Sequence, residues 1–62
     1  MNQDEIRERM RKYIVQRGIK QSYISKVLCL YTSNLSKFKQ NKLNLPMKDL
    51  IKLDQYLKER NF

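Results

Sequence analysis

The stretch from Gly18 to Asn41 constrains the fold more than any other part of this 62-residue chain. Its aliphatic and Phe side chains recur at positions 19, 24, 27, 28, 30, 35 and 38. This spacing predicts two short helices that meet near Cys29, each with a narrow apolar stripe. Because helices of this length are unstable alone, each must pack against the other and against the rest of the chain.

The whole chain, residues 1–62, is expected to form one domain, since it is near the lower size limit for a single core. Its single Gly and single Pro leave few places for tight turns, which favours an all-α fold. Apolar periodicity predicts a compact four-helix unit. The helices are expected at about 3–17, at 21–28, from Tyr31 or Thr32 to about Gln40, and at about 46–60.

Several helix ends carry recognisable signals. Asn2 followed by Glu5 is typical of a helix start, and Gly18 stands where a left-handed residue is needed to end a helix. Thr32 is a better cap than Tyr31 chemically, and Asn41 is an acceptable left-handed terminator. Lysine is a poor cap, so the second helix, after Lys20, relies on packing for its start.

The expected core consists of the apolar stripes of these helices and the two leucines of the loop before the last helix. We also expect Cys29 to behave as a buried small hydrophobe, and the hydroxyl of Ser25 to need a local partner, a backbone carbonyl one turn back. The core residues expected are Ile6, Met10, Tyr13, Ile14, Ile24, Val27, Leu28, Leu35, Phe38, Leu43, Leu45, Met47, Leu50, Ile51, Leu53 and Leu57.

Charge is distributed unevenly along the chain, which has a net charge of +8. Between Arg9 and Lys48 there are ten Lys or Arg residues and no acid. A solvated surface usually mixes both signs, so this segment indicates a polyanionic partner. The chain has no His and one Cys, its acids lie near its two ends, and no catalytic or metal-binding cluster can be assembled. We therefore expect no enzyme activity, cofactor, metal or small-molecule ligand.

The lone cysteine cannot form an internal disulfide, which fits a reducing compartment. The first twelve residues are mostly polar and charged, so they do not resemble a signal peptide. The longest apolar run, Val27 to Tyr31, has five residues, whereas a membrane span needs about 20. The expected location is cytoplasmic and nucleoid-associated.

The stretch from Gly18 to Asn41 resembles the helix-turn-helix of the Xre/Cro/phage lambda repressor-like family. The matching residues are Ile19, Gln21, Ile24, Ser25, Leu28, Leu30, Leu35, Ser36 and Phe38. The likeness extends from residue 5 to about residue 57. Departures from the family pattern are Cys29 at the turn glycine, Asn41 at the closing glycine, and Lys20 and Tyr31 at the usual Ser caps. A left-handed Cys29 would cost about 1 kcal/mol or more.

The resemblance implies a sequence-specific, double-stranded DNA-binding transcriptional regulator, a phage or mobile-element repressor that reads the major groove with its third helix. The implied base-reading residues are Thr32, Ser33 and Lys37, and Lys37 can donate to guanine O6 and N7. The implied phosphate-binding residues are Gln21, Asn34, Gln40, Asn41 and Lys42.

Such a regulator is expected to bind as a homodimer or as paired monomers on half-sites about 34 Å apart. The predicted dimer contacts are Tyr56, Leu57 and Phe62, which are expected to extend beyond the core. Two alternatives stay open at this point. One is a helix-turn-helix fold used for protein contact, as in an antitoxin or phage-encoded inhibitor, and the other is a basic membrane-surface protein built on the last helix.

Overall fold

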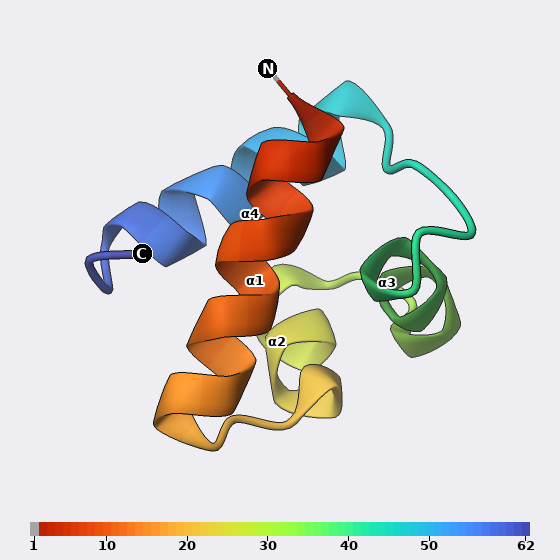
Figure 1. The fold of residues 1–62 in the computed structure, drawn as a ribbon. Helices are drawn as coiled ribbons and strands as arrows, with labels where there is room; N and C mark the ends of the chain where they lie inside the picture. The colour runs from red at the N-terminus through yellow and green to blue at the C-terminus, as the bar shows by residue number, and fades with distance from the viewer. Residues whose placement is uncertain (1) are drawn as a thin grey trace.

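Four helices account for most of residues 2–62, which the computed structural model describes. They are α1 (Gln3–Arg17), α2 (Gln21–Leu28), α3 (Thr32–Lys39) and α4 (Met47–Lys58). Within the described residues no strand occurs, so the predicted all-α class is confirmed. In Figure 1, α4 crosses behind the first half of α1, α2 lies beside its second half, and α3 lies to the right. Contacts join α1 to both α4 and α3, and α2 to α3.

The predicted helix boundaries are confirmed to within two residues. Helix α1 begins as expected, because the Asn2 side chain accepts hydrogen bonds from the backbone N–H groups of Asp4 and Glu5 at 2.8 and 3.2 Å. Helix α3 begins at Thr32, with Tyr31 preceding it. Pro46 precedes α4 with an extended ψ of 154°, so this helix begins one residue later than predicted.

Each helix is followed by a left-handed residue, and the chain turns there in the same way. These residues are Gly18, Cys29, Asn41 and Asn61, with φ between 57° and 64°. In every case the next residue's N–H bonds to a carbonyl five positions back, at 2.8 to 3.2 Å. This pattern is the Schellman motif, which satisfies carbonyls that the helix itself leaves unpaired. Glycine alone adopts this conformation without strain, and only the first of the four sites has one.

The core contains most of the predicted residues, with some corrections. The buried apolar residues are Ile6, Met10, Tyr13, Ile24, Leu35, Phe38, Leu45, Leu50, Leu53, Tyr56 and Leu57. Ile14, Leu28, Leu30 and Phe62 pack against them. The prediction was wrong for Val27, Met47 and Ile51, whose exposed fractions are 46%, 55% and 40%. A short helix buries only a narrow stripe, and these side chains lie at its margins. Cys29 is exposed rather than buried, because its left-handed backbone ends the helix there.

The three predicted dimer contacts do not extend beyond the core, because they lie in it or pack against it. Tyr56 and Leu57 are 3% and 0% exposed, so they belong to the protomer's own core. The hydroxyl oxygens of Tyr56 and Tyr13 are 2.9 Å apart, and burial raises the pKa of Tyr56 to about 12. Phe62 packs edge-on against the Tyr13 ring, with centroids 5.3 Å apart. The C-terminal turn folds these side chains inward, so Tyr56 and Leu57 present little surface to a second copy.

Among residues 2–62, Arg7 is the one cationic side chain in the core, with 3% of the residue exposed. Its Nε donates to the Phe38 carbonyl at 2.5 Å, and its guanidinium carbon lies 4.5 Å from the centre of the Phe38 ring. The two terminal nitrogens bind Asp4 at 2.5 Å and Asn44 at 3.0 Å. A buried guanidinium is tolerated only when its donors are satisfied, and here they join α1, the end of α3 and the following loop.

Arg9 has a similar role at the other side of α1. Its Nη1 lies 2.5 Å from the Asp54 carboxylate on α4, and its Nε donates to the Phe62 carbonyl at 2.6 Å. Lys58 adds a second cation 3.2 Å from the same carboxylate. The hydrogen bond from Arg9, reinforced by Lys58, holds the pKa of Asp54 below its ordinary value of 3.8. The pair fixes the C-terminal turn against α1.

Replacing Arg7 with Met should lower the free energy of unfolding by about 2–4 kcal/mol, because the Phe38 carbonyl then loses its buried donor. Urea denaturation followed by circular dichroism measures this. Lys12→Met, which removes an exposed lysine from the same helix, is the control and should change stability by less than about 0.5 kcal/mol. Equal effects of the two substitutions would contradict the role of Arg7 as the donor to the Phe38 carbonyl.

Acid should weaken the fold through Asp54. Its folded pKa lies below the unfolded value of 3.8, so the ionised carboxylate stabilises the fold above that pH. That contribution is lost progressively as the pH falls through 3.8 and then through the lower folded pKa. Urea midpoints measured across this range should therefore fall more steeply for the wild type than for Asp54→Asn, which should already be less stable at pH 7. Parallel curves would show that Asp54 contributes nothing.

Candidate nucleic-acid interface

Helix α3 has one polar outer face. Ser33, Lys37 and Gln40 follow one another at spacings of four and three residues, which places them on the same side of a helix. All three are exposed, whereas Leu35 and Phe38 on the opposite side are fully buried. This arrangement leaves hydroxyl, ammonium and amide groups directed outward along an eight-residue helix.

The C-terminal end of α3 is held by two arginines of α1. Arg7 donates to the carbonyl of Phe38, and Arg11 donates through both Nε and Nη2 to the carbonyl of Lys39. Carbonyls at the end of a helix have no partner within it and carry partial negative charge, so cations there are doubly favourable. Helix α1 thus sets the position of the outer face of α3.

The junction of α2 and α3 is fixed by hydroxyl groups. Ser25 is 2% exposed, and its Oγ donates to the Ser22 carbonyl at 2.9 Å, as the sequence predicted. The same Oγ is 2.8 Å from Oγ1 of Thr32, which joins the two helices directly. The hydroxyl of Thr32 is therefore engaged with α2. Of the three predicted base-reading residues, only Ser33 and Lys37 present a hydroxyl or an amine on the outer face.

The predicted phosphate-binding residues do not form one cluster. Asn34 lines a groove of about 200 Å³ with residues of α4 such as Lys48 and Lys52, so it lies on another side of α3. Gln40 is on the outer face, where its Nε2 donates to Ser36 Oγ at 3.3 Å. Asn41 and Lys42 are exposed just after α3.

Gln21 stands at the first position of α2 and is half-buried. No side chain caps the N–H groups at the start of α2, because Lys20 has no acceptor to offer. The start of α3 after Tyr31 is likewise without a side-chain cap. Both helix starts therefore present backbone N–H groups that favour an anion.

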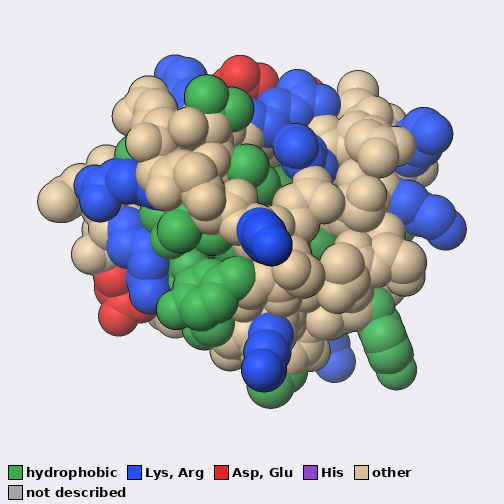
Figure 2. All heavy atoms as spheres, turned by 90° about the horizontal axis from the view of Figure 1, so that it is seen from below, with side chains coloured by type: hydrophobic (Ala, Val, Ile, Leu, Met, Phe, Trp, Pro, Cys, Tyr) green, Lys and Arg blue, Asp and Glu red, His purple; other side chains and the backbone are tan. Residues whose placement is uncertain are grey.

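The surface charge of this region comes from lysine. Arg7, Arg9 and Arg11 all donate to groups within the protein, so fewer cations are free than the sequence indicated. The exposed or half-exposed cations from Lys20 to Lys42 are Lys20, Lys26, Lys37, Lys39 and Lys42, and the segment contains no acid. Figure 2 views the molecule from the side of α2 and shows cations around a hydrophobic cluster, with acids at the edge.

Ser36 was not predicted as a site residue, and neither were the two arginines that hold α3. Ser36 follows Ser33 by three residues and precedes Gln40 by four, so helical spacing could have placed it beside the outer face. Nothing in the sequence indicates Arg7 or Arg11, because their carbonyl partners lie 31 and 28 positions away.

Comparisons with family models, with curated proteins and with solved structures gave no match to this chain.

The turn before α3 offers a test of backbone strain. Cys29 has φ of 57° and ψ of 43° and is exposed, so its replacement by Gly removes strain without removing core packing. We expect Cys29→Gly to stabilise the fold by about 0.5–1 kcal/mol, after allowing for the greater chain entropy of glycine. Cys29→Ala keeps the strain and should change little. The measurement is the difference between the urea midpoints of the two variants. A glycine variant no more stable than the alanine variant would contradict the expected strain at position 29.

Proposed function

We propose that this chain is a sequence-specific double-stranded DNA-binding transcriptional regulator, with α2 and α3 acting as a lambda repressor-like helix-turn-helix. The observation that carries the proposal is the outer face of α3, where Ser33, Lys37 and Gln40 stand together in a segment without acids. B-DNA's major groove admits one α-helix, and its base edges offer acceptors for such donors. Occlusion of a promoter is the simplest mechanism for so small a protein.

The surroundings of α3 support the same function. The uncapped start of α2 at Gln21 suits a phosphate, and so do the exposed Asn41 and Lys42 beyond α3. Lys37 has the reach and charge to donate to guanine. Thr32 keeps a methyl group that could pack on thymine, although its hydroxyl is bonded to Ser25. We infer modest base recognition and a large contribution from phosphate contacts.

The membrane-surface alternative is disfavoured by packing. It requires the apolar face of α4 to be free, but Leu50, Leu53 and Leu57 are fully buried. Among the described residues, no helix combines the length and apolar character needed to cross a bilayer.

Selection of bound sequences from random duplex DNA at two salt concentrations tests the proposal. We expect enrichment of a defined site at both concentrations, with affinity that falls as salt rises. Paired half-sites about 34 Å apart would indicate two copies on DNA, joined through residues other than Tyr56 and Leu57. Salt-sensitive binding without enrichment would contradict sequence specificity, and an absence of binding would contradict the function.

Two lysine variants separate base recognition from phosphate binding. Lys37→Ala should relax the preference at one base pair and cost about 1–3 kcal/mol of discrimination there. Lys42→Ala should weaken binding to all sequences alike and reduce the salt slope by about one unit. Lys12→Ala on α1 is the matched control and should leave both the base preference and the salt slope unchanged. If Lys37→Ala produced the same uniform loss as Lys42→Ala, Lys37 would be a phosphate contact only.

A further inference from the structure

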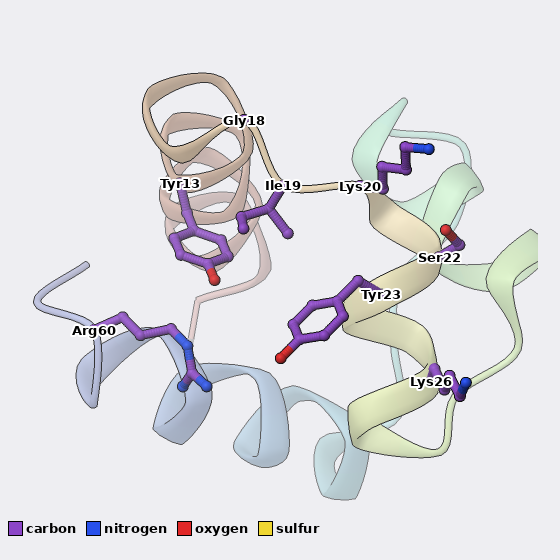
Figure 3. Close-up of a pocket in the computed structure, with 8 residues that line it drawn as sticks. All are labelled: Tyr13, Gly18, Ile19, Lys20, Ser22, Tyr23, Lys26 and Arg60. Atoms are coloured by element: carbon purple, nitrogen blue, oxygen red, sulfur yellow. The ribbon is translucent and has the colours of Figure 1, made fainter.

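A groove of about 420 Å³ lies outside the α3 face, between the end of α1, α2 and the end of α4. Figure 3 shows that Tyr13, Ile19, Tyr23 and Arg60 point into it from these segments. Tyr13 belongs to the core, and Ile19 packs against it, so together they form an apolar floor. Tyr23 is 52% exposed and stands as an aromatic wall. The groove therefore combines a rigid floor with a large side chain still available to a partner.

Cations lie at two edges of this groove. Lys20 and Lys26 lie along the α2 edge together with Ser22, and Arg60 lies at the α4 edge (Figure 3). Arg60 is held in place, since it donates to the Tyr56 carbonyl at 3.0 Å and lies 3.7 Å from the centre of the Tyr56 ring. No acid is among the residues that line the groove, and Glu59 touches Arg60 only at 3.9 Å. The rim is therefore complementary to negative charge.

The shape of the groove favours a polypeptide over a small molecule. Sites for small molecules bury most of the ligand surface, but this groove is open to solvent between three segments of the chain. An amphipathic segment can lie along such a groove and place its apolar residues on the floor. Its acidic residues would then meet the lysines and the arginine on either side.

We propose that the groove formed by Tyr13, Ile19 and Tyr23 is a docking site for an acidic amphipathic segment of another protein. Tyr23 is the anchor, since exposed tyrosines contribute large contact area and a hydroxyl at interfaces. Lys20, Lys26 and Arg60 select acidic partners and raise the rate of association. The outward groups of Ser33 and Lys37 do not line the groove, so docking does not require α3 to be bound to DNA.

The test is selection from a displayed library of random peptides about 16 residues long, enough for roughly four helical turns. We expect enriched peptides to carry large apolar residues at helical spacing, three or four positions apart, with Asp or Glu at the positions between them. Titration of the most enriched synthetic peptide into isotopically labelled protein should shift the amide signals of Ile19, Tyr23 and Arg60. Those of Ser33 and Lys37 should stay in place.

Two exposed tyrosines provide matched variants. Tyr23→Ala should weaken binding of that peptide at least about tenfold, whereas Tyr31→Ala, which removes a tyrosine outside the groove, should change it little. The double variant Lys20→Ala, Lys26→Ala should weaken binding and reduce its salt dependence. Circular dichroism confirms that each variant is folded.

Three outcomes would overturn the proposal. They are enriched peptides without acidic residues, equal losses from Tyr23→Ala and Tyr31→Ala, and signal changes confined to α3. A single-stranded oligonucleotide that shifted the groove amides more strongly than any peptide would assign the site to nucleic acid instead.

Discussion

The structure depends on one buried guanidinium. Arg7 of α1 joins the carbonyl of Phe38, the ring of the same residue and the side chain of Asn44, so it connects α1 with the end of α3 and the loop that leads to α4. A chain of 62 residues has little apolar area to bury, and a branched polar side chain with fixed geometry can position three segments at once. Its neighbour Arg11 binds the next carbonyl, which completes the attachment of α3.

The arginines in the middle of α1 and the lysines around α3 have separate roles. The planar guanidinium groups of Arg7, Arg9 and Arg11 donate to carbonyls and carboxylates inside the fold. The ammonium groups of Lys37 and Lys42 remain exposed around α3. Net charge alone therefore overstates the charge available to a partner, and the distribution of lysine is the better guide to the surface that a polyanion would contact.

Two faces of the α2–α3 pair have different chemistry. The outer face of α3 is polar and is held from behind by α1, which suits the proposed contact with base edges. The groove beside α2 has an apolar floor and a cationic rim, which suits a polypeptide. Lys20 and Lys26 belong to the helix between these faces, so a bound acidic segment would reduce the positive charge near the start of α2. The two proposed contacts would then oppose one another.

The sequence by itself determined the four helices, because Gly18, Asn41 and the apolar spacing report local conformation directly. The exposure of Ser33 and Lys37 also follows from the sequence, because Leu35 and Phe38 occupy the opposite side of the same helix. Their role at base edges stays a prediction. Only the tertiary structure decided the burial and the contacts of side chains at the edges of each helix's apolar stripe. Val27 is exposed, Tyr56 is buried, Thr32 turns to Ser25, and Asn34 faces α4. These outcomes depend on how helices distant in sequence are oriented, which the period of a single helix cannot specify.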